Sequence, residues 1–230
     1  MLFTLVLVGC SGEAGETTTT STVVTSTSAQ AATTTTPPTT TTTVGITTTS
    51  TAQGEEVPSG LQVFGGPEVG FTLWVPAQWV AMSSEDFDPQ ALAGILGDSF
   101  DPAVVDMVEA TFAGGGLLFA MDPVPTGQFF DNVNVIRAPA SGFTAEGVAN
   151  VLGAQMEQMA NAEDVVAEVV DVPAGQAARV SYRLPDFGSE GVLYQIFTED
   201  AEWVVTFSVA DFDTFDHDVD ELIASFQPVP

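Results

Sequence analysis

Residues 164–209 read DVVAEVVDVPAGQAARVSYRLPDFGSEGVLYQIFTEDAEWVVTFSV, and this stretch decides the fold class. Its runs of alternating and β-branched apolar residues predict four strands, over 164–172, 177–184, 191–198 and 203–209. The run 177–184 alternates most clearly, with Arg179, Ser181 and Arg183 on one face and apolar side chains on the other. Turn residues at 173–175 and 199–201 separate neighbouring runs, so we expect hairpins and an antiparallel sheet.

Further strands and helices are expected upstream and downstream of this stretch. Alternating or short apolar runs predict strands over 71–75, 116–121 and 131–137. Helices are predicted after Asp88-Pro89, after Asp101-Pro102 and after Thr144, since each start offers a capping side chain. A last helix through 219–226 is expected to be capped by Asp213 or Thr214. Strands in hairpins with helices packed on them predict one α+β domain over 61–230.

The amino terminus, MLFTLVLVGC at 1–10, predicts export and lipid anchoring. Its apolar run is too short to span a bilayer and is typical of a signal peptide. The sequence LVGC at 7–10 resembles the lipobox of bacterial lipoproteins, which implies cleavage before Cys10 and lipidation of its thiol. No Lys or Arg precedes the run, so either the protein begins upstream of Met1, or Cys10 lies in an ordinary cleaved signal peptide.

A low-complexity tether is predicted between Cys10 and the domain. More than half of the residues in 17–51 are threonine, without aromatic or charged side chains, so the segment lacks the apolar surface that a packed core requires. We therefore divide the chain into a signal peptide at 1–9, the lipidated cysteine with a disordered tether at 10–60, and the domain. This organisation predicts a lipid-anchored protein on the extracytoplasmic face of the cell membrane.

Several segments of the domain resemble the PsbP/Mog1-like fold. The segment VGFTLWVPAQW at 69–79 is similar to its opening motif, and other parts are similar to its later strands and last helix: 131–135, 179–182, 194–209 and Ser225-Phe226. Actinobacterial lipoproteins of the LpqN/LpqT type join a lipobox, a Ser/Thr-rich linker and this domain in the same order. The resemblance implies a binding or assembly factor, not an enzyme. The helical segment 86–113 departs from the pattern.

The charge balance restricts the partners. The chain has 31 acidic residues against 3 arginines and no lysine, a net charge of −28. Such a chain repels phosphate backbones, so we predict no nucleic-acid partner. The excess charge indicates either a well-solvated surface or recruitment of divalent cations or of a basic partner.

The sequence offers few groups for catalysis. His217 is the single histidine, Cys10 is assigned to the anchor, and lysine is absent, which argues against two-histidine metal sites, thiol nucleophiles and Schiff bases. We predict no enzyme, no cofactor and no metal centre. The acidic run 211–221 retains a weak surface calcium site as an alternative, although it lacks the central glycine and final glutamate of an EF-hand loop.

Arg179 and Arg183 are the candidate ligand-binding residues. They are four residues apart on one strand face, about 13 Å from each other. They could flank an anionic ligand, or they could form ion pairs with acidic residues on neighbouring strands.

We therefore expect a non-enzymatic domain that binds a protein or an envelope component, through an open sheet face or the segment 86–113. The alternative is a carrier or sensor of a small hydrophobic ligand or glycolipid, held between sheet and helices. A hydrolase that uses paired carboxylates is a third hypothesis.

Overall fold

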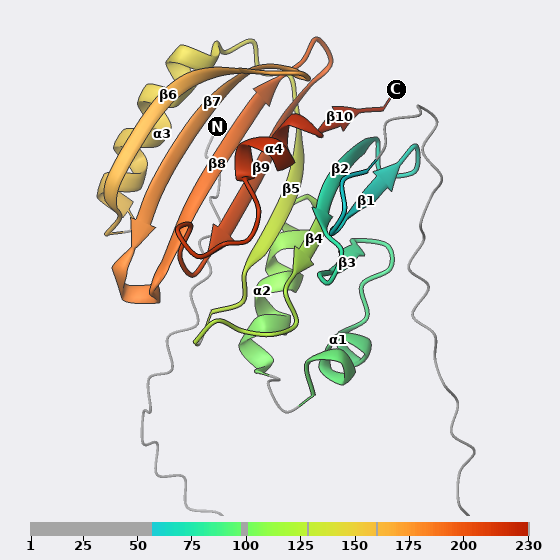
Figure 1. Cartoon of the computed structure of the whole chain (residues 1–230). Coiled ribbons are helices and arrows are strands. Elements are labelled where there is room, and N and C mark those ends of the chain that lie inside the picture. The colour runs from blue at the N-terminus through green and yellow to red at the C-terminus, as the bar shows by residue number, and fades with distance from the viewer. Residues whose placement is uncertain (1–56, 98–100, 128, 160, 230) are drawn as a thin grey trace, which may run out of the picture. The chain divides into compact units, whose positions relative to one another are not determined.

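The computed structural model describes residues 57–97, 101–127, 129–159 and 161–229. The predicted signal peptide, Cys10 and all of the tether before residue 57 lie outside these residues, so they stay predictions. The described residues belong to one unit, built from a seven-stranded sheet, a three-stranded sheet and four α-helices (Figure 1). The predicted α+β class is confirmed.

The seven-stranded sheet is antiparallel throughout, in the order β3-β4-β5-β9-β8-β7-β6. Its strands are β3 (Val80–Ser83), β4 (Gly116–Met121), β5 (Asn132–Pro139), β6 (Glu163–Val172), β7 (Gly175–Leu184), β8 (Ser189–Phe197) and β9 (Ala201–Val209). The four strands of the stretch 164–209 form consecutive hairpins, as predicted. A short 3-10 helix at Pro185–Phe187 and the left-handed Gly188 make the turn between β7 and β8.

The three-stranded sheet consists of β1 (Leu61–Gly66), β2 (Phe71–Pro76) and β10 (Gln227–Pro228), with β2 in the centre. Alternate residues of β2, namely Phe71, Leu73 and Val75, are fully buried and belong to the main core. Phe71 contacts Trp203 of β9 edge-on and Phe226 by stacking, each with ring centres 5.7 Å apart. The main core is therefore formed where the small sheet packs on the large one.

Four helices complete the domain: α1 (Pro89–Leu96), α2 (Pro102–Ala113), α3 (Ala145–Met159) and α4 (Val219–Ala224). The predicted caps of the first two are confirmed, because Asp88 accepts a hydrogen bond from the Gln90 backbone and Asp101 one from Ala103, both at 2.9 Å. The hydroxyl of Thr144 likewise accepts from the Gly147 backbone at 3.2 Å.

The helices pack on different parts of the large sheet. Helix α3 packs on β6 and β7, where Met156 shares a core with Val180 and Tyr182. Helices α1 and α2, from the segment 86–113, enclose a separate core over β4.

The predicted start of the last helix was wrong. Helix α4 begins after Asp218, whose carboxylate accepts from the Asp220 backbone at 2.9 Å, and residues 213 and 214 lie in an upstream turn. The acidic side chains of its first turn are Asp220 and Glu221. Phe226 lies beyond the helix end, yet it is fully buried in the main core.

Candidate functional site

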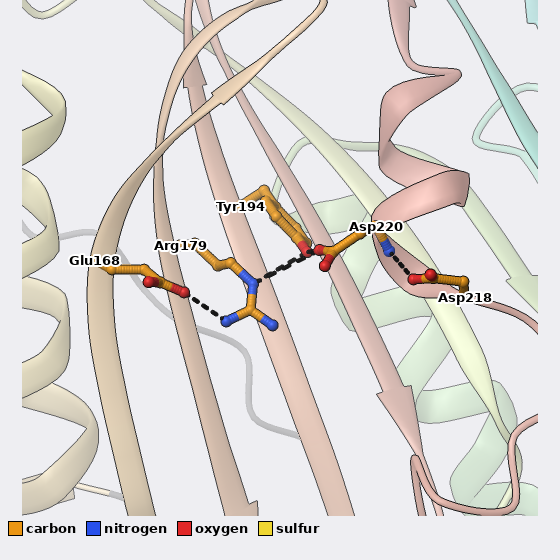
Figure 2. Close-up of polar contacts among 5 residues, drawn as sticks. All are labelled: Glu168, Arg179, Tyr194, Asp218 and Asp220. Atoms are coloured by element: carbon orange, nitrogen blue, oxygen red, sulfur yellow. Dashed lines mark hydrogen bonds and ion pairs between the residues drawn. The ribbon is translucent and has the colours of Figure 1, made fainter.

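Arg179 of β7 lies at the centre of a polar network that joins three strands to α4 (Figure 2). Its guanidinium donates to Glu168 of β6 at 2.9 Å and to the Tyr194 hydroxyl of β8 at 3.2 Å. The Tyr194 hydroxyl in turn donates to Asp220 of α4 at 2.6 Å, and Asp218 caps the same helix. The pairings Glu168–Arg179 and Arg179–Tyr194 place these side chains in register across neighbouring strands, which explains why they meet.

The network stabilises its own charges. Burial, followed by the hydrogen bond to Asp220, raises the pKa of Tyr194 well above its ordinary value, because both favour the neutral phenol. Burial lowers the pKa of Arg179, but the contacts with Tyr194, Asp220 and Glu168 outweigh that effect and raise it. Arg179 is therefore a permanent cation held by acceptors of the same chain.

Arg183 is held in a similar way at the end of β7. Its guanidinium donates to Asp164 at 2.5 Å and lies 3.5 Å from Glu190. The structure thus gives Arg179 and Arg183 the cross-strand ion pairs that were one of the two predicted roles. Their binding of an anionic ligand stays a prediction, and such a ligand would have to displace carboxylates already in contact.

The acidic run 211–221 does not converge on one point. Asp211 accepts from the Asp213 backbone at 2.8 Å, Asp218 caps α4, and Asp220 accepts from Tyr194. Within the described ranges, no group of three or more His, Cys, Asp or Glu side chains is placed to hold a metal ion. His217 is half-buried and lies edge-on to Phe215, with ring centres 5.8 Å apart.

A buried carboxylate that we did not single out from the sequence belongs to Glu202 of β9, which is 1% exposed. It accepts from the Ser141 backbone at 2.7 Å, from the Ser141 hydroxyl, and from the Gln195 amide at 2.8 Å. These donors compensate the lost hydration of the carboxylate. Glu202 thus fastens the loop before α3 to the sheet.

Strand β6 lies at one edge of the large sheet, and β3 lies at the other (Figure 1). Among the described strands β6 pairs with β7 alone, and every residue of its ten-residue length is exposed or half-buried. Val166 and Val169 are 52% and 39% exposed there. Phe143, just before the neighbouring α3, and Val151, in the middle of that helix, are also large exposed apolar residues.

An edge strand of this kind can pair with an added strand, because half of its backbone donors and acceptors point away from the sheet. Natural edges are usually short, covered or interrupted by charge. Strand β6 is long and carries acidic residues, but it also presents apolar side chains. Sequence periodicity gave the strand itself but did not show that it lies at an edge.

Comparisons with known proteins describe the fold. No protein-family model and no curated protein matches the chain significantly. Among solved structures, the chain is similar to the solution structure of cyanobacterial PsbP from Synechocystis sp. PCC 6803. The TM-score is 0.49 at 16% sequence identity, over 78% of this chain and 98% of that chain.

The assignment to the LpqN/LpqT type stays a prediction. In the part of the chain that the structure describes, no helix has the length and hydropathy needed to cross a membrane.

Proposed function

We propose that this protein is a lipid-anchored envelope lipoprotein whose domain is a non-enzymatic binding module. Cys10 would hold it on the extracytoplasmic face of the membrane, and the edge of β6 would be its contact surface for a protein partner. The observation that carries the proposal is the long accessible edge of β6, with exposed Val166 and Val169.

The placement of the two valines favours a partner that adds a strand. In register they oppose Ser181 and Ala178 of β7, which are an odd number of residues apart, so the valines lie on opposite faces of the sheet. A strand paired with β6 places its own side chains on both faces, where each could contact one valine. A partner that docked on one face alone would leave the other valine exposed.

Charge favours a basic partner. Strand β6 carries four exposed acidic residues, which are Glu163, Asp164, Glu168 and Asp171. Asp164 pairs with Arg183, and Glu168 pairs with Arg179. With a net charge of −28, two copies of this chain would repel each other at this edge. An extended segment with Lys or Arg near its ends would form ion pairs with Glu163 and Asp171, which lie near the two ends of β6.

The test compares two sets of surface substitutions in the tagged full-length protein. The double variant Val166→Lys/Val169→Lys removes apolar contact and adds charge of the same sign as the expected partner. Val124→Lys is the matched control, since Val124 is 71% exposed and lies outside β6. Proteins crosslinked in cells of the source organism are quantified by mass spectrometry.

We expect one discrete basic partner, recovered with wild type and with the control, and lost with the double variant. Equal recovery with the double variant would contradict the role of β6. Enrichment of lipid or glycolipid in place of a protein would instead favour the carrier hypothesis. The anchor is tested separately, because Cys10→Ala should abolish incorporation of labelled fatty acid.

A further inference from the structure

Arg137 on β5 differs from the other two arginines of the chain. Arg179 and Arg183 each contact two carboxylates, whereas no described carboxylate oxygen lies within 4.0 Å of Arg137. The chain has 31 acidic residues and only 3 arginines, so an arginine without a carboxylate partner among the described residues is unexpected. The side chain of Arg137 is exposed and lies instead over the indole ring of Trp203, 5.3 Å from its centre.

Trp203 of β9 likewise carries a donor without a hydrogen-bond partner among the described residues. It is directly opposite Arg137 in the strand register, and it is 2% exposed. Its Nε1 is a buried donor without a hydrogen-bond partner among the described residues. An unsatisfied buried donor costs about 1–3 kcal/mol, so proteins rarely keep one without a reason.

Packing fixes the position of this donor. The indole contacts Phe71 and Phe226 edge-on, with ring centres 5.7 and 5.5 Å apart. The Trp203 ring therefore cannot easily turn its nitrogen toward a different acceptor. The guanidinium of Arg137 thus lies over the face of an indole whose N–H has no acceptor among the described residues.

We infer that Arg137 and the Trp203 indole N–H form a binding site for an oxyanion, either a carboxylate or a phosphate group of a small ligand. The guanidinium would supply the charge and two parallel donors, and the indole would supply a third donor of fixed direction. Because Nε1 is covered by its neighbours, a bound oxygen reaches it only when the packing around the indole opens locally.

The net charge of the chain opposes an anion at long range, but salt screens that repulsion beyond about 8 Å at physiological ionic strength. The site therefore selects its ligand by contact, and we expect weak affinity. Four strand spacings separate β5 from β6 in the sheet, roughly 19 Å, so this site is distinct from the proposed protein-binding edge.

The test is nuclear magnetic resonance of the full-length protein with its three tryptophan indoles labelled by nitrogen-15. Inorganic phosphate and acetate are titrated separately at constant ionic strength, so that the two arms distinguish the two oxyanion sources. We expect a saturable shift of the Trp203 indole signal with at least one of them. Arg137→Gln should weaken this binding by about tenfold or more, the factor that corresponds to 1.4 kcal/mol.

Arg183→Gln is the control, because it removes a cation that is already paired on a different strand, and it should leave the titration unchanged. The inference is overturned if neither anion shifts the Trp203 signal, as expected when only water occupies the donor. It is also overturned if Arg137→Gln shifts with the same midpoint as wild type.

Discussion

The replacement Tyr194→Phe tests whether the network beneath α4 stabilises the domain. Tyr194 is 1% exposed, so the substitution keeps the buried ring and deletes only the hydroxyl. That hydroxyl donates to Asp220 at 2.6 Å and accepts from Arg179 at 3.2 Å. Each net hydrogen bond contributes about 1 kcal/mol, and more where a partner is charged.

Part of that contribution is recovered in the variant. The side chain of Asp220 is 72% exposed and would be solvated, while Arg179 would keep its ion pair with Glu168. We therefore expect Tyr194→Phe to lower the free energy of unfolding by about 1–2 kcal/mol.

The other tyrosine gives a matched control. Tyr182 on β7 is also buried, at 5% exposure, and its hydroxyl has no hydrogen-bond partner among the described residues. Burial alone raises the pKa of Tyr182 to about 12. Tyr182→Phe should change the free energy of unfolding by less than about 0.5 kcal/mol. Urea unfolding followed by tryptophan fluorescence measures both variants. A Tyr194→Phe variant no less stable than Tyr182→Phe would refute the role of the network.

Three further predictions concern buried groups and close packing. Burial raises the pKa of both tyrosines, so the phenol stabilises the fold fully below the unfolded pKa near 10 and loses that effect as the pH rises toward the folded pKa. Ultraviolet titration should show no tyrosinate near pH 10 while the protein stays folded, and one tyrosine ionising there would contradict this. Glu202→Gln replaces one of the two acceptor oxygens with an amide donor, which then faces either the donors of Ser141 or that of Gln195. Urea unfolding should show a loss of about 1–3 kcal/mol in the free energy of unfolding, and an unchanged midpoint would contradict the assigned contacts. Gly153→Ala should lower the melting temperature, because the new Cβ would lie 2.9 Å from the Cβ of Ala167 on β6. Gly94→Ala in α1 should raise the melting temperature, because its new Cβ contacts nothing within 4 Å and alanine favours the helix. The opposite order of melting temperatures would show that packing does not decide the two effects.

Local sequence signals were sufficient for most elements of the fold. The strands of the stretch 164–209 alternate over many residues, and Asp88, Asp101 and Thr144 each precede a helix that they cap. These features depend on neighbours in sequence, so periodicity and capping chemistry reveal them.

The missed strands depend on distant partners. Strand β3 has four residues and β10 has two, which is too short for any alternation to show. Strand β1 ends in two glycines, which propensity disfavours. All three exist because they pair with β2 or β4, and no local pattern encodes that pairing.

The start of α4 and the unpaired arginine illustrate the same limit. Several aspartates in 211–220 are chemically equal caps, and burial of Leu222 and Ile223 in the main core decides which one is used. The state of Arg137 depends on β5 lying beside β9, two strands far apart in the chain. The ion pair of Arg179 was easier to foresee, because β6 and β7 form a hairpin.

The measurement that tests the proposed function most directly is photo-crosslinking from β6 in living cells. A photoreactive amino acid replaces Val169 in the full-length protein, and the same amino acid at Val124 is the control, since both side chains are exposed. We expect one discrete crosslinked protein, basic in composition, from position 169 and not from position 124. The same products from both positions, or no product from position 169, would contradict a partner bound at the β6 edge.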